Sequence, residues 1–180
     1  MGYTVMLEFD KESQNKINEI ISVICENGVN SFMIDAKGNP HIAIASYGEI
    51  NEERFYKKLE EFSNKTRSFE LRFESVGIFY FERNIIYLAP VITDELIRVH
   101  EEFHSSFDSD CCRKPFEHYM PNKWVPNCRV AVNATMEETL SAISSLSTIF
   151  KPFNIRVEGI SVADFNTLEY TAIHELADIN

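Results

Sequence analysis

The chain has 180 residues, 44% of them hydrophobic and 25% charged, and a net charge of −11. It has enough apolar residues for one hydrophobic core, but no run of the ~18 apolar residues that a membrane span requires. The acidic excess argues against an extended nucleic-acid surface, because sequence-independent binding to phosphates needs clustered Lys and Arg side chains. A phosphorylated ligand is therefore expected only in a small local site.

The first half of the chain alternates strand-like and helix-like segments. Apolar residues at helical spacing predict a helix that is capped by Asp10 or Ser13 and ended by Gly28, and a second helix from Glu49 onward. Runs of strand formers predict strands at 3–9, 32–34, 41–47 and, as three strand-like runs, within 69–82 and 84–90.

The second half repeats this plan. Thr93 or Asp94 caps a predicted helix that runs to about Phe107, and a loop with three prolines follows. Thr135 and Glu138 have the spacing of a capping box at the start of another helix. The predicted strands are VPNCRVAV, FNIRVEGISVADF and TLEYTAIHEL.

The two halves thus share an order in which a strand is followed by a helix and antiparallel strands. The strand that begins at His41 corresponds to the strand around Asn127. We therefore predict an α+β protein, a single domain over 1–180 with two similar αβ lobes at approximately 1–88 and 89–180.

The four cysteines are Cys25, Cys111, Cys112 and Cys128, and none of them has C-x-x-C spacing. The N-terminus shows no basic leader followed by an apolar stretch. We expect reduced thiols in a cytoplasmic protein.

The stretch VHEEFHSSF contains His-Glu-x-x-His, with His100, Glu101 and His104. On a helix this spacing puts two imidazoles on one face, as in zinc hydrolases, but a third ligand is also needed and the longer metzincin pattern is missing. Leu96, His100, Phe103 and Phe107 form one helical stripe, which favours a structural role. We keep a zinc hydrolase as a remote alternative and expect no metal and no cofactor.

The stretch NPHIAIASY is more informative. In a strand, His41, Ala43 and Ala45 point one way and the intervening isoleucines the other, so the histidine has small neighbours and room for a ligand. A satisfied structural histidine is the alternative. In WVPNCRVAVN, Asn127 and Arg129 share one strand face, opposite Cys128, Val130 and Val132.

PHIAIASY and WVPNCRVAVNATMEETL resemble the two signature strands of the two-histidine (2H) phosphoesterases, the 2'-5' RNA ligase-like family. Members carry His-x-Thr/Ser twice, typically as Pro-His-x-Thr-Leu. The resemblance covers nearly the whole chain and includes Trp-x-Pro before the second motif. It implies two αβ lobes with antiparallel sheets that form a central groove, and metal-free chemistry at 2',3'-cyclic or 2'-5' phosphodiesters. In that chemistry one imidazole takes a proton and the other gives one, while the hydroxyls hold the phosphate.

This chain departs from the motifs at three positions. His41 matches the first histidine, but Ala43 replaces the first hydroxyl, Asn127 the second histidine and Arg129 the second hydroxyl. Losing one general acid or base costs ~10²–10⁴ in rate. Arg129 is either a clamp for phosphate or a groove-filling residue that pairs with one of the many carboxylates.

Three further residues are candidates for ligand binding. One of them, His118, lies in the loop before the second motif. The other two, Tyr47 and Trp124, have rings that, like that of Tyr119, can stack on a base, although core or rim packing explains each equally well. We therefore expect a small phosphorylated ligand, a nucleotide, a cyclic phosphodiester or an RNA end, with weak or rewired phosphodiesterase activity through His41. The alternative is a non-catalytic binding protein, and the oligomeric state is left open.

Overall fold

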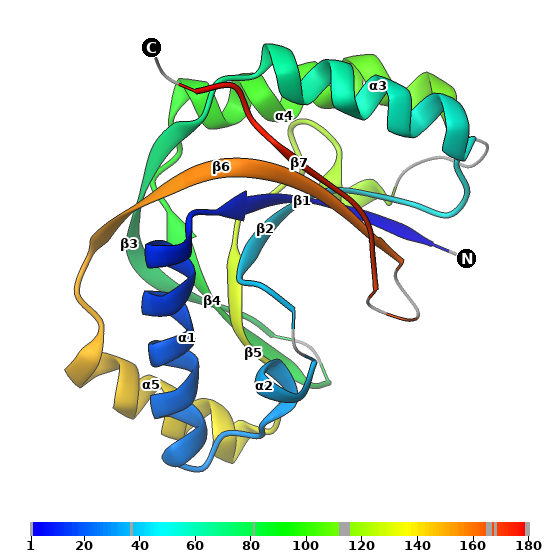
Figure 1. Ribbon diagram of the computed structural model, residues 1–180. Helices are drawn as coiled ribbons and strands as arrows, with labels where there is room; N and C mark the ends of the chain where they lie inside the picture. The colour runs from blue at the N-terminus through cyan, green and yellow to red at the C-terminus, as the bar shows by residue number, and fades with distance from the viewer. Residues whose placement is uncertain are drawn as a thin grey trace.

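The computed structural model in Figure 1 describes residues 2–36, 38–80, 82–111, 116–164, 167 and 169–178. The strands are β1 (Tyr3–Phe9), β2 (His41–Tyr47), β3 (Phe69–Phe79), β4 (Asn84–Pro90), β5 (Cys128–Ala134), β6 (Phe153–Asp164) and β7 (Tyr170–Glu175). The helices are α1 (Lys11–Glu26), α2 (Phe32–Asp35), α3 (Glu52–Lys65), α4 (Asp94–Phe107) and α5 (Met136–Ile149). The α+β fold is confirmed.

Over the described residues, the strands form one seven-stranded antiparallel sheet in the order β2-β1-β6-β3-β4-β5, with β7 paired to β6. The long strand β6 pairs with β1 along one edge, and with β3 and then β7 along the other. A strand from the second half of the chain therefore lies between strands from the first half. The lobe boundary near residue 88 stays a prediction.

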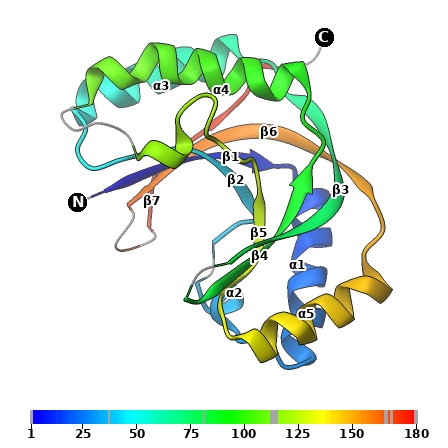
Figure 2. The same cartoon turned by 180° about the vertical axis from the view of Figure 1, so that it is seen from behind.

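The sheet curls so that its two end strands, β2 and β5, lie side by side (Figures 1 and 2). Burial raises the pKa of the Cys128 thiol on β5, and the nearby backbone of His41 on β2 partly offsets this. The two predicted motif strands are therefore neighbours, although β2 pairs in the sheet with β1 and β5 with β4. This arrangement sets the position of the site.

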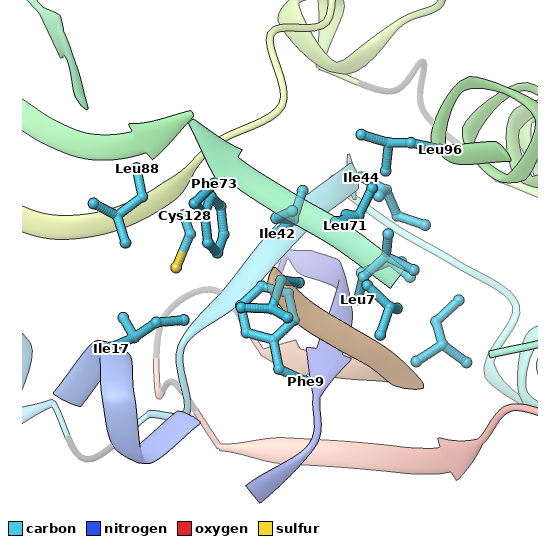
Figure 3. Close-up of a cluster of buried hydrophobic side chains, with 14 of the residues drawn as sticks. Leu7, Phe9, Ile17, Ile42, Ile44, Leu71, Phe73, Leu88, Leu96 and Cys128 are labelled. Carbon is cyan, nitrogen blue, oxygen red and sulfur yellow. The ribbon is translucent and has the colours of Figure 1, made fainter. Parts of the chain in front are cut away.

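The longer helices lie in two pairs, α1 with α5 and α3 with α4, at opposite ends of the curled sheet (Figure 2). Side chains from several of these elements meet in the hydrophobic core, where Leu7, Phe9, Ile17, Phe73 and Leu88 are buried (Figure 3). Burying such a side chain contributes ~1.5–3 kcal/mol each. None of the helices in the described part of the chain is long and apolar enough to cross a membrane.

Hydrogen-bonding side chains cap the starts of the longer helices. Asp10 accepts the backbone N–H of Ser13 at the start of α1, and Thr93 accepts that of Leu96 at the start of α4. The predicted capping box of Thr135 and Glu138 is present at α5, with both of its reciprocal hydrogen bonds. Each such cap stabilises by ~1 kcal/mol.

Two segments differ from the sequence-based expectation. Residues 32–34 are not a strand but part of the helix α2, where the Ser31 carbonyl accepts the N–H groups of Ile34 and Asp35 at 2.9 Å. Three apolar residues are too few to show a hydrophobic period, so the sequence does not distinguish a helix from a strand here. The stretches at 69–82 and 84–90 form two strands rather than three, because β3 is continuous over 11 residues.

Candidate functional site

A cavity of about 530 Å³ lies where β2 and β5 meet, and side chains from β1, β2, β5, β7 and α2 line it. Both motif strands carry an irregularity beside it. The β1–β2 register shifts between Val5 and Met6, and the β4–β5 register shifts on both sides of Ile86. Bulges of this kind redirect side chains, and they are common next to functional sites.

His41 is the first residue of β2 and lines the cavity. Its Nδ1 donates to the carbonyl of Asn39 at 2.7 Å; since a carbonyl only accepts, this hydrogen bond assigns the proton to Nδ1. Burial lowers the pKa of His41, the Asn39 carbonyl partly offsets this, and the Arg129 charge lowers it further. The imidazole is therefore neutral near pH 7, with a free lone pair on Nε2.

Arg129 lies on β5 and lines the same cavity as His41. Its Nη2 is 3.5 Å from the hydroxyl of Tyr119, which is long for a hydrogen bond. Among the described residues, no carboxylate is ion-paired with this guanidinium. The sequence left two interpretations of Arg129, a clamp for phosphate and a partner in an ion pair. The ion pair is not formed within the part of the chain that the structure describes.

The other two motif positions differ from each other. Ala43 lines the cavity, as its place on the His41 face predicts, and its small side chain leaves the space open. Asn127 lies just before β5, where its side-chain amide donates to the carbonyl of Val125 at 2.7 Å. Asn127 does not belong to the lining, so the structure brings only three of the four motif positions to the cavity.

The predicted strand faces hold for the first part of β5 only. Cys128 and Val130 are fully buried behind Arg129, as expected. Val132, however, lines the cavity together with Asn133, whose φ is 55°. The register shifts beside Ile86 break the simple alternation, so Val132 turns towards the face of Arg129 instead of away from it.

Three predicted ligand-contacting residues lie elsewhere. Tyr47 is fully buried and donates its hydroxyl to Asp108 at 2.8 Å, so the prediction that its ring stacks on a ligand is wrong. Trp124 stacks on the ring of His100 at 4.0 Å and donates to the Ala43 carbonyl, which makes it a support behind β2. His118 is exposed, packs against Tyr119 and does not line the cavity.

The His-Glu-x-x-His motif has a structural role. His100 Nε2 donates to the carbonyl of Tyr119 at 2.8 Å, and His104 Nε2 donates to that of Ile44 at 3.0 Å. Both imidazoles are buried, and Glu101 between them is exposed. Nitrogens that donate to carbonyls are not available as metal ligands, so this geometry contradicts the zinc hydrolase. No metal-binding group of three or more His, Cys, Asp or Glu side chains occurs among the described residues.

Several cavity residues were not foreseen from the sequence. Asn39 and Tyr170 bring polar groups, Arg83 a second guanidinium and Asp164 a carboxylate. Tyr119, one of the rings that the sequence suggested for stacking, also lines the cavity. Arg83, Asp164 and Tyr170 lie far from both motifs in the sequence, in the loop before β4 and on β6 and β7. Only the proximity of Asn39 to the Pro-His motif gave any signal.

The comparisons with known proteins agree with this geometry. The sequence model of the 2'-5' RNA ligase superfamily matches residues 12–167. The fold is similar to TT0787 of Thermus thermophilus, with 13% identity, a TM-score of 0.63 and 98% of each chain covered. It is also similar to E. coli LigT complexed with 3'-AMP, with 15% identity, a TM-score of 0.57, and 97% of this chain and 94% of that chain covered. Usb1 of Kluyveromyces marxianus shares 11% identity, with a TM-score of 0.51 and 97% of each chain covered. No curated protein sequence matches the chain.

A match over residues 12–167 covers most of the 180-residue chain. The chain therefore belongs to the 2'-5' RNA ligase superfamily, as the two motif strands indicated. The solved structures share its α+β architecture at low identity.

Proposed function

We propose that this chain binds a small phosphorylated ligand, a nucleotide or cyclic phosphodiester, in the cavity between β2 and β5. The observation that carries the proposal is Arg129, a partly buried cation that faces the cavity without an ion-paired carboxylate among the described residues. A buried charge without a partner is costly, and an anionic ligand compensates for it.

The neighbouring groups suit a phosphate. The planar guanidinium of Arg129 can hold two phosphate oxygens, and its charge already acts on His41, which lowers the histidine's pKa. Arg83 adds a second cation to the lining, against a single carboxylate, Asp164, among the described lining residues. The site is therefore locally cationic in a chain whose net charge is −11.

The remaining lining fits a nucleoside. The rings of Tyr119, Tyr170 and Phe32 are available for stacking, and the side chain of Asn133 for hydrogen bonds to a base. The complex of E. coli LigT, a protein of similar fold, with 3'-AMP supports the same class of ligand here.

Catalysis is proposed to be weak or rewired around His41. A neutral imidazole with a free Nε2 can take a proton from an attacking hydroxyl or water. The complementary general acid is missing at the second motif, because Asn127 does not titrate and its amide is bonded to the Val125 carbonyl. A chain that binds the ligand without turnover is the second candidate, and the loss of the motif hydroxyl at Ala43 favours it.

Calorimetric titration with 3'-AMP and with 2',3'-cyclic AMP tests the binding site. Arg129→Ala is expected to weaken binding by about 10–100-fold, the loss of a charge-assisted hydrogen bond. Arg72→Ala is the matched control, since it removes the same charge from an exposed arginine of β3 that is paired with Glu74 at 2.6 Å. Equal affinity in the two variants would refute the proposal.

A further inference from the structure

A buried carboxyl that the proposed chemistry does not use lies next to His41. Glu8 on β1 is directly opposite His41 in the β1–β2 register, and its residue is only 6% exposed. Gly159 of β6 lies opposite Glu8 on the other side, where a Cβ atom would be 3.2 Å from the Glu8 Cβ. The missing side chain at 159 therefore makes room for the carboxyl.

Polar interactions connect this carboxyl to the loop before β2. Ser161 Oγ donates to Glu8 Oε1 at 2.5 Å, and the side chains of Asn39 and Tyr170 also interact with the carboxyl. The hydroxyl of Tyr170 accepts the backbone N–H of Asn39 at 3.1 Å. The Asn39 carbonyl in turn accepts the proton of His41 Nδ1.

These residues come from four adjacent strands, Tyr170 from β7, Ser161 from β6, Glu8 from β1 and His41 from β2, and Asn39 lies in the loop before β2 (Figure 1). Pro40, between Asn39 and His41, has no N–H and a fixed φ, so the anchored Asn39 backbone determines where its carbonyl points. Among the described residues, no hydrogen-bond partner lies at bonding distance from the other oxygen, Glu8 Oε2, which is buried. Burying an oxygen without a hydrogen bond costs ~1–3 kcal/mol. This cost would have no explanation if Glu8 only filled space.

We infer that Glu8 and Tyr170 are positioning residues for His41: they fix Asn39 so that its carbonyl holds the proton on Nδ1 and leaves Nε2 free towards the cavity. The inference rests on the proposed function for its purpose, because a free Nε2 is what a base or a phosphate contact needs at this site. The hydrogen bonds from which it is argued are present in the chain without a ligand.

Nitrogen-15 NMR of the histidine rings in the ligand-free protein tests this role. In wild type, His41 is expected as the Nδ1–H tautomer. Tyr170→Phe removes only the hydroxyl, and it is expected to give a mixture that contains the Nε2–H tautomer. Tyr56→Phe is the matched control. The hydroxyl of Tyr56 donates to Thr171, the neighbour of Tyr170 on β7, at 2.9 Å and does not touch Asn39.

Glu8→Gln provides a second variant that keeps the shape of the side chain, and it is expected to shift the tautomer in the same direction. Unchanged His41 ring shifts in Tyr170→Phe would overturn the inference, even if Glu8→Gln does not fold. If Arg129→Ala leaves ligand affinity intact, the proposed function fails while the tautomer result still stands or falls by itself. If the proposed binding site and the positioning role are both correct, Tyr170→Phe is also expected to weaken 3'-AMP binding by about 2–10-fold.

Discussion

The histidines of this chain are held in different environments, which decide what each can do. His41 has one ring nitrogen bonded to a carbonyl and one side on the cavity, next to a guanidinium. His100 is packed between Trp124 and His104, and burial, with the charge of His104, lowers its pKa to about 4. Of these two, only His41 combines a free nitrogen with access to a ligand.

The depressed pKa of His100 makes the stability depend on pH. The unfolded chain takes up a proton at His100 near pH 6.5, and the folded chain does so only near pH 4. The contribution of neutral His100 to the free energy of unfolding is therefore fully present above pH 6.5 and is lost as the pH falls towards 4. Between pH 7 and pH 5, wild type is expected to lose about 2 kcal/mol of unfolding free energy more than His100→Asn does.

Urea denaturation at the two pH values measures this difference. The effects of other titrating groups, such as Glu8, cancel when the two proteins are compared, because both contain these groups. His118→Asn, at an exposed histidine, is the control and is expected to follow wild type. An identical pH dependence of His100→Asn and wild type would contradict the assignment.

At the scale of elements, α4 holds the edge strand that carries His41. The shift in the β1–β2 register leaves Ile44 without an opposite residue, since Val5 pairs with Ala45 and Met6 with Ala43. The carbonyl of Ile44 is satisfied instead by His104 Nε2 at 3.0 Å, from α4. The His-x-x-x-His spacing of this helix thus serves the bulge of β2 and not a metal.

His104→Ala is expected to destabilise the protein by about 1–3 kcal/mol, because the buried carbonyl of Ile44 loses its donor. Glu101→Ala, the middle residue of the same motif, is exposed and is expected to change the stability by less than about 0.5 kcal/mol. Thermal unfolding of both variants, with and without added zinc, measures this. Stabilisation of wild type by zinc that is lost in His104→Ala would instead restore the metal reading.

For the whole molecule, the charge distribution supports the proposed binding site. A chain of net charge −11 keeps two guanidinium groups, Arg83 and Arg129, around one cavity, beside the neutral His41. The curl of the sheet causes this, since it brings the two end strands together from distant parts of the sequence. The acidic remainder repels competing anions of large size, so a small ligand is expected.

The sequence was sufficient for the family and the α+β class, and it predicted that His41 and Arg129 line one cavity. Strand alternation and the positions of the two motifs both place His41 and Arg129 there, although Arg129 departs from the motif in residue type. Tyr47 was misplaced because an aromatic side chain in a strand reads equally as core or as ligand contact, and burial decides between them.

The residues that were missed depend on long-range geometry. Tyr170 reaches the cavity because β7 pairs with β6, and Val132 because of a bulge that no local pattern encodes. The helix α2 lines the cavity through Phe32 and Met33, which were expected in a strand. Neither sheet curl nor bulge position follows from hydrophobic periodicity in one sequence.

The most direct test of the binding site is a crystal structure of this chain with 2',3'-cyclic AMP. We expect the phosphate within hydrogen-bond distance of both His41 Nε2 and the Arg129 guanidinium. An opened ring would add that His41 still supports turnover, whereas an intact ring would indicate binding alone. A nucleotide whose phosphate lies away from both side chains, or an empty cavity at a saturating concentration, would contradict the account.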